Sequence, residues 1–89
     1  MLQEDVDALD ALNRLPDFFE VYHRSSFRCY RNTNTGAVQE VIVEVLDAGP
    51  GKSPRYRVAA KAKGGKVASG DPSDDIDAAV AMIRWSDLD

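Results

Sequence analysis

Cysteine and histidine are almost missing from this chain, whose 89 residues include only Cys29 and His23 of these two types. A single cysteine cannot form an intramolecular disulfide, so the sequence excludes the class of small secreted proteins that disulfides hold together. A structural zinc site takes four ligands, and no zinc-finger spacing is present. The acidic runs at residues 5–10 and 74–77 lack the EF-hand pattern and suit helix N-termini, so we expect no metal and no cofactor.

Long apolar runs are also missing. The longest one, near residues 78–83, is far shorter than the roughly twenty residues of a membrane-spanning helix. The first residues show no basic segment followed by an apolar stretch, so we expect no signal peptide. Together with the lone cysteine, these features predict a cytoplasmic protein that has no membrane partner.

The overall composition is that of an ordinary globular chain, with 44% hydrophobic residues, 29% charged residues and a formal net charge of -4. An intrinsically disordered chain would have fewer apolar residues or a larger net charge. The length suits one small domain over residues 1–89, too small to enclose a deep cofactor cavity. The charge is uneven, because acidic residues gather at both ends and basic residues in the middle.

Apolar periodicity predicts a helix near each end. In residues 5–15, Val6, Leu9 and Leu12 recur with spacing three. A second helix is predicted to start at Asp71 and Pro72, because Asp is a good N-cap and Pro is favoured at the first helical position. Residues 17–22 fit either a short helix or the start of a strand, and we favour a short helix or turn. Residues 86–89 are expected to form a polar tail.

Alternation of apolar and polar residues predicts strands at residues 26–31, 37–46 and 55–63, and a short return strand at residues 66–69. Gly64 and Gly65 fit a two-residue hairpin turn, because both positions need a positive φ. We therefore predict a two-layer α+β fold of αβββα type, in which a three- or four-stranded antiparallel sheet carries the N- and C-terminal helices on one face. Trp85 is expected to be largely buried, and the predicted core contains Leu9, Leu12, Phe19, Phe27, Val41, Val43, Val45, Tyr56, Val58, Ile76, Val80 and Ile83.

Conventional catalytic side chains gather in one short segment, which holds His23, Ser25, Ser26 and Cys29. A nucleophile and its base would also need an orienting group and an oxyanion hole, and no motif supplies either one. The glycine-rich stretches match turns rather than phosphate-binding loops. We therefore expect a protein that is not an enzyme.

One basic face is the candidate binding site. If the apolar side chains of residues 55–63 face the helices, the basic ones project from the opposite side, where a neighbouring strand adds an arginine and a tyrosine. The predicted site consists of Arg28, Tyr30, Arg55, Arg57, Lys61 and Lys63. The plainer interpretation is cross-strand pairing, with Glu40 and Glu44 opposite Arg57 and Lys61.

The predicted order of helix, strands and helix resembles the layout of double-stranded-RNA-binding domains over most of the chain. That family has both helices on one sheet face and grips phosphates with a lysine cluster at the start of its second helix. This sequence has carboxylates at that place, in Asp71, Asp74, Asp75 and Asp77. Because these would repel a phosphate backbone, the resemblance implies the fold and not the RNA binding.

Three functional hypotheses follow from these features. The first is a protein-interaction module without catalytic activity, which self-associates or serves as an accessory subunit through an open sheet face or a free strand edge. The second is nucleic-acid binding through the basic sheet face, with Tyr30 as a stacking platform. The third is an acidic inhibitor or antitoxin-like protein that occupies a basic site on its target. We favour the first, because the chain as a whole is acidic and charge alone also serves solubility.

Overall fold

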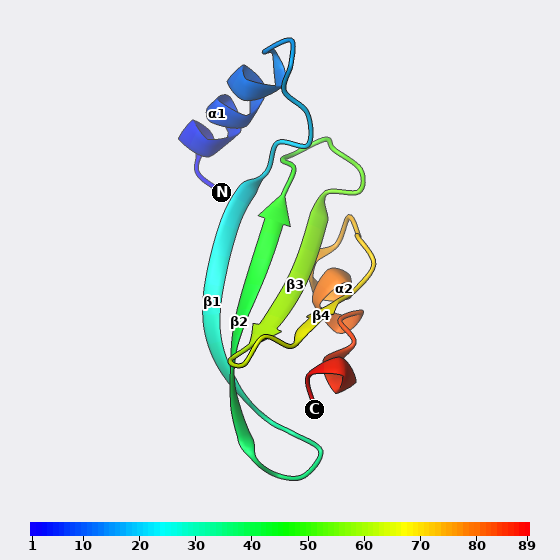
Figure 1. Ribbon diagram of the computed structural model, residues 1–89. Coiled ribbons are helices and arrows are strands. Elements are labelled where there is room, and N and C mark those ends of the chain that lie inside the picture. Colours follow the sequence, from blue (N-terminus) through cyan, green and yellow to red (C-terminus); the bar gives the residue numbers. More distant parts are fainter.

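The computed structural model describes residues 1–89 and contains one sheet (Figure 1). The elements in chain order are α1 (Gln3–Asn13), β1 (His23–Asn32), β2 (Val38–Asp47), β3 (Tyr56–Ala62), β4 (Val67–Ser69), α2 (Ile76–Ala81) and the 3-10 helix η1 (Trp85–Leu88). The four strands are antiparallel and lie in the order β1-β2-β3-β4, so each strand pairs with the next one along the chain. The predicted α+β class and antiparallel sheet are confirmed.

Strand register divides the sheet into two faces. Phe27 of β1 lies opposite Val43 of β2, which lies opposite Ala60 of β3. Directly opposite residues point to the same side of an antiparallel sheet. We call this side the inner face, which contains Ser25, Phe27, Cys29, Val41, Val43, Val45, Tyr56, Val58, Ala60, Ala62 and Ala68. The other side, the outer face, contains Arg24, Arg28, Tyr30, Glu40, Ile42, Glu44, Arg57, Ala59, Lys61 and Val67.

The hydrophobic core lies between α2, η1 and the inner face of β2, β3 and β4. Its buried residues are Val41, Val43, Val58, Ala60, Ala62, Ala68, Ala79, Ile83 and Leu88. Many of them are alanines, and such small side chains let the C-terminal segment approach the sheet closely. At Gly70 the approach is closer still, because an added Cβ would lie 2.5 Å from the carbonyl oxygen of Met82.

The C-terminal segment differs from its predicted form in two ways. The helix begins at Ile76 rather than at Asp71, because Ser73 and Tyr56 exchange two backbone hydrogen bonds and keep the preceding residues extended beside β3. Asp75 is the N-cap instead, and its side chain accepts a hydrogen bond from the Asp77 N–H. The polar tail that was expected at residues 86–89 is instead mostly part of η1, and Leu88 in this helix is completely buried.

The first helix does not lie over the sheet. Figure 1 shows α1 beyond the end of the sheet where β1 begins. Its one buried residue, Leu9, approaches the β2–β3 loop, since a Cβ at Gly49 would lie 3.2 Å from a Leu9 methyl carbon. Asp5 also contacts His23 at 3.5 Å. The prediction that both terminal helices lie on one sheet face is therefore wrong for α1. The apolar side of α1 contacts the β2–β3 loop and the start of β1 instead. No helix is long and apolar enough to cross a bilayer.

The predicted core is confirmed in part. Leu9, Val41, Val43, Val58 and Ile83 are buried, whereas Val45, Tyr56, Ile76 and Trp85 are half-buried against the core. Phe19 is 81% exposed, because residues 18–22 form neither a helix nor a strand that could pack it. Phe27 is 54% exposed, because no helix lies over its strand, and Leu12 and Val80 are also exposed. The buried alanines and Leu88 were not predicted.

Candidate functional site

An open apolar groove lies on the inner face between β1 and α2. Its volume is about 530 Å³, and eight of its nine lining residues are hydrophobic. The lining residues are Ser25, Phe27, Cys29, Val43, Val45, Tyr56, Ile76, Val80 and Trp85. The groove lies apart from the predicted basic site, because its β1 residues alternate with Arg28 and Tyr30 and point to the other face.

The groove exists because the C-terminal helices cover only part of the inner face. α2 has six residues and packs over β3, while η1 packs beside β4. The sheet is wider than this cover, so the middle of β1 carries Ser25, Phe27 and Cys29 without a second layer. Phe27 is therefore half exposed although its cross-strand neighbour Val43 is buried. Phe27 thus leaves part of a large aromatic ring exposed to solvent beside the groove, although burial of such a ring is favourable.

His23, Ser25 and Cys29 share the inner face without forming a hydrogen-bonded unit, whereas Ser26 lies opposite Glu44 on the outer face. His23 contacts Asp5 of α1 at 3.5 Å, and no hydrogen bond joins it to Ser25 or Cys29. Cys29 is exposed and free. No group of three His, Cys, Asp or Glu side chains is arranged to hold a metal ion. The inner face therefore offers an apolar surface rather than an array of polar groups.

The structure brings together four of the six residues predicted for the basic site. Arg28, Tyr30, Arg57 and Lys61 share the outer face, and Lys63 follows β3 in the turn at the end of the sheet. Tyr30 is 64% exposed. Arg57 donates a hydrogen bond to the Tyr22 hydroxyl at 3.0 Å. Neither Arg57 nor Lys61 has a carboxylate within ion-pair distance.

Glutamates occupy the centre of the outer face, and they pair differently from the prediction. Glu40 lies 3.4 Å from Arg28, and Glu44 lies 3.5 Å from Arg24. Both partners belong to β1, whereas Arg57 and Lys61 of β3 had been expected. The reason is the register, which places Arg57 opposite Leu46 and Lys61 opposite Ile42. The outer face is consequently a mixed-charge surface.

Arg55 does not belong to this face. It precedes β3, and its guanidinium binds the Asp47 carboxylate through two hydrogen bonds of 2.8 and 3.1 Å. The Gly49 N–H donates a third hydrogen bond to Asp47 at 2.8 Å. Burial raises the pKa of Asp47, but the hydrogen bonds from Arg55 and Gly49 and the Arg55 charge outweigh burial and lower this pKa below its ordinary value. Arg55 is thus a structural ion-pair partner at the end of the sheet.

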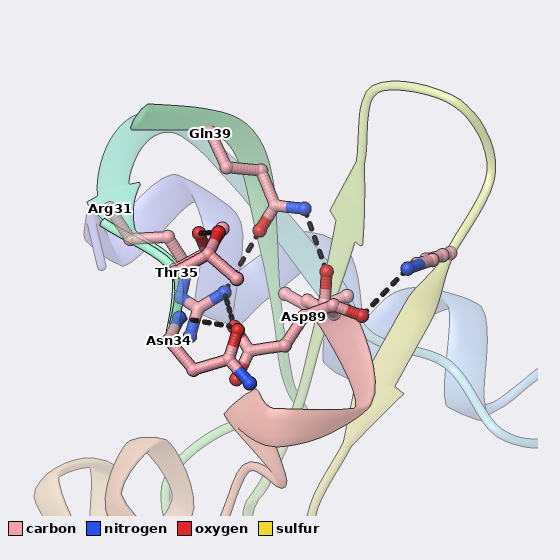
Figure 2. A network of polar contacts seen from close by, with 8 residues as sticks. Arg31, Asn34, Thr35, Gln39 and Asp89 are labelled. Atoms are coloured by element: carbon pink, nitrogen blue, oxygen red, sulfur yellow. Dashed lines mark hydrogen bonds and ion pairs between the residues drawn. The ribbon is translucent and has the colours of Figure 1, made fainter. Parts of the chain in front are cut away.

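A second polar network fastens η1 to the β1–β2 hairpin (Figure 2). Arg31 Nη1 donates hydrogen bonds of 2.9 Å to both Gln39 and Asp89. The Gln39 side chain donates to the Leu88 carbonyl at 2.7 Å, and Lys66 Nζ donates to the Asp89 carbonyl at 2.6 Å. Every long polar side chain here has a partner within the chain, so the network explains how Leu88 stays buried rather than how a ligand would bind.

Comparisons with known proteins provide no relative. No family model matches the chain, and neither a curated protein nor a solved structure matches it.

Proposed function

We propose that this chain is a cytoplasmic protein-interaction module without catalytic activity, which binds another polypeptide through the groove of the inner face and the adjoining edge of β1. The observation that carries the proposal is Phe27, which is 54% exposed beside an apolar groove of about 530 Å³. Exposed apolar patches on small proteins mark contact sites. The exposed Cys29 has no disulfide partner, which supports a reducing compartment.

The chemistry of the groove favours a polypeptide over a small polar ligand. Only Ser25 among the lining residues is polar, so few groups could orient a polar molecule. β1 is an edge strand of ten residues that pairs on one side with β2. An edge of this kind accepts a further strand through backbone hydrogen bonds, while pockets beside it receive alternate side chains.

Site-specific photocrosslinking tests this proposal in cells that naturally make the protein. A benzophenone amino acid replaces Phe27 on the inner face or, as the matched control, Tyr30 on the outer face of the same strand. Both positions are aromatic and more than half exposed. We expect discrete protein adducts from position 27 and few from position 30. Adducts confined to position 30, or none from either position, would contradict the proposal.

Nucleic-acid binding through the outer face is the second candidate. It is supported by Arg57 and Lys61, which have no carboxylate partner, and by the exposed ring of Tyr30. Glu40 and Glu44 between them oppose it, because phosphate binding depends on uncompensated cations. Fluorescence anisotropy with single- and double-stranded oligonucleotides tests it. Binding that weakens with salt and is lost in the Arg57→Ala, Lys61→Ala double variant would promote this candidate above the first.

A further inference from the structure

The ladder beside β3 is interrupted where β4 ends. Ala59 of β3 lies opposite Ser69, the last residue of β4. Further along, Tyr56 lies opposite Ser73. The segment after β4 therefore holds one residue more than β3 between these two pairs, which is the arrangement of a β-bulge. Bulges leave backbone groups without their usual partners, so the groups at this place decide what the bulge can bind.

The backbone groups of Val58 point into the bulge. Tyr56 exchanges two backbone hydrogen bonds with the segment after β4, and the Ala62 N–H donates to the Lys66 carbonyl. Because the bonded side alternates along an antiparallel strand, the even-numbered residues of β3 direct both their N–H and C=O groups to this side. Val58 is one of them, but no hydrogen bond joins its N–H or its carbonyl to residues 70–72.

The C-terminal segment explains why this pair stays open. A Cβ at Gly70 would lie 2.5 Å from the Met82 carbonyl oxygen, so the chain at Gly70 runs tightly against the end of α2. The Arg84 N–H also donates to the Ser69 carbonyl at 3.3 Å. These contacts draw the segment after β4 away from β3. Pro72 cannot close the ladder instead, because proline has no N–H to donate.

The open pair lies in a pocket of about 260 Å³ on the outer face. Val58 lines this pocket although its side chain is buried in the core on the inner face, so it contributes backbone atoms. Leu46, Ala59 and Pro72 supply apolar walls. Arg57 lines the pocket as well. One water molecule takes up roughly 30 Å³ in the liquid, so the pocket has room for an organic group.

The polar groups of the pocket select the chemistry of a ligand. Val58 is 4% exposed, and buried peptide groups need hydrogen-bonding partners. The Val58 carbonyl and the Glu44 carboxylate disfavour an anion, and the Arg57 guanidinium disfavours a cation. A neutral carboxamide satisfies the remaining requirement, because it carries an acceptor oxygen and N–H donors side by side.

We infer that this pocket binds a neutral carboxamide that is attached to a small apolar body. The carboxamide oxygen accepts a hydrogen bond from the Val58 N–H, and the carboxamide N–H donates to the Val58 carbonyl. These two bonds take the place of the missing cross-strand pair. The apolar walls cover the body of the ligand, and the planar Arg57 guanidinium can stack on a flat one. The pocket lies on the outer face, so this inference does not depend on the groove of the inner face.

Amide hydrogen exchange followed by NMR tests the open pair in the free protein. The Val58 amide hydrogen should exchange about tenfold faster or more than those of Tyr56 and Ala60, because backbone hydrogen bonds protect amides from exchange. Tyr56 and Ala60 are matched controls, since both belong to the same strand and direct their N–H groups to the same side. A Val58 amide as protected as these two would show that the pair is closed and would overturn the inference.

Titration with benzamide tests the class of ligand. We expect millimolar benzamide to shift the amide resonances of Val58 and Gly70 and to slow the exchange of the Val58 amide. Benzoate and N,N-dimethylbenzamide are the matched controls, because both keep the ring and lack the N–H donor. Equal shifts with all three compounds would indicate general apolar contact and overturn the inference. No response to benzamide would mean that Val58 bonds only to water, which overturns it too.

A variant that fills the pocket completes the test. Ala59→Leu places a larger side chain in the pocket and should weaken benzamide binding about tenfold or more. Val67→Leu is the matched control, because Val67 also lies on the outer face but does not line this pocket. Both variants should keep the wild-type circular dichroism spectrum. Unchanged benzamide affinity in Ala59→Leu would overturn the assignment of the ligand to this pocket.

Discussion

The inner face of the sheet has one half that α2 and η1 cover and another, on β1, that they leave open. The covered half carries small side chains, and the open half carries a large one. Beneath α2 and η1, the sheet presents the small residues Ala60, Ala62 and Ala68, which are almost completely buried. On β1 it presents Phe27, one of the largest side chains in the protein, which stays half exposed. Whether a side chain of the inner face is buried depends on whether the C-terminal segment lies over it, and not on how hydrophobic the side chain is. The covered half maintains the fold, and the open half is available for contact.

The largest effect is expected where the covered half is filled most completely. Leu88 is completely buried in η1, so Leu88→Ala should lower the free energy of unfolding by about 2–5 kcal/mol. Denaturant unfolding followed by circular dichroism measures the loss. Leu2→Ala is the control, because Leu2 is 66% exposed and should leave stability unchanged. A Leu88→Ala variant as stable as the wild type would show that η1 does not seal the core.

Close approach of backbones gives the next effect. A methyl group at Gly70 would meet the Met82 carbonyl at 2.5 Å, and backbone atoms cannot yield as a flexible side chain does. We expect Gly70→Ala to destabilise the protein by about 1–3 kcal/mol, as overpacked cores do. Thermal unfolding of the variant and the wild type measures this loss of stability. A neutral result would mean that the C-terminal segment can move away from β4 without penalty.

Asp47 ends the apolar stripe of β2 with a buried charge, and it makes stability depend on pH. Its pKa lies below the ordinary value of 3.8, so ionised Asp47 stabilises the fold above about pH 4. This contribution is lost as the pH falls through the lowered pKa. Asp47→Ala should cost about 1–3 kcal/mol at neutral pH, because Arg55 loses its hydrogen-bonded partner.

The pH dependence provides the control for Asp47. Denaturant midpoints between neutral pH and pH 2 should fall less in Asp47→Ala than in the wild type, since the variant lacks the carboxylate that protonation neutralises. Parallel curves for the two proteins would assign the acid sensitivity to other carboxylates.

The smallest change in stability is expected in the open half. Phe27→Ser should alter the free energy of unfolding by about 0.5 kcal/mol or less, because the ring has no covering layer. Binding of an environment-sensitive apolar dye should nevertheless decrease, since the ring lines the groove. A loss as large as that of Leu88→Ala would mean that the two halves do not differ.

Local chemistry in the sequence was sufficient to predict the sheet. The alternation along β2 and β3 gave their faces, and the glycine pair gave its hairpin, in which Gly64 and Gly65 both have positive φ. The placement of Arg28, Tyr30, Arg57 and Lys61 on one face followed from the same alternation.

The features that sequence reasoning missed depend on distant contacts. The second helix is shortened by the pairing of Ser73 with Tyr56, which lie far apart along the chain. Arg55 leaves the outer face because Asp47, across the β2–β3 loop, offers a hydrogen-bonded carboxylate. The groove exists because no helix lies over β1. The sequence contained one indication of it, namely a large apolar residue, Phe27, on a strand for which the C-terminal segment offers no long covering helix.

The uninterrupted strand order also bears on how fast the protein folds. Because β1 to β4 are successive neighbours, each hairpin closes a short loop, and such topologies of low contact order fold quickly. The exception is the return of η1 to the first hairpin, where Arg31 meets Asp89 across 58 positions of the chain. That closure loses the most chain entropy, so we expect the contact between η1 and the first hairpin to form after the hairpins themselves.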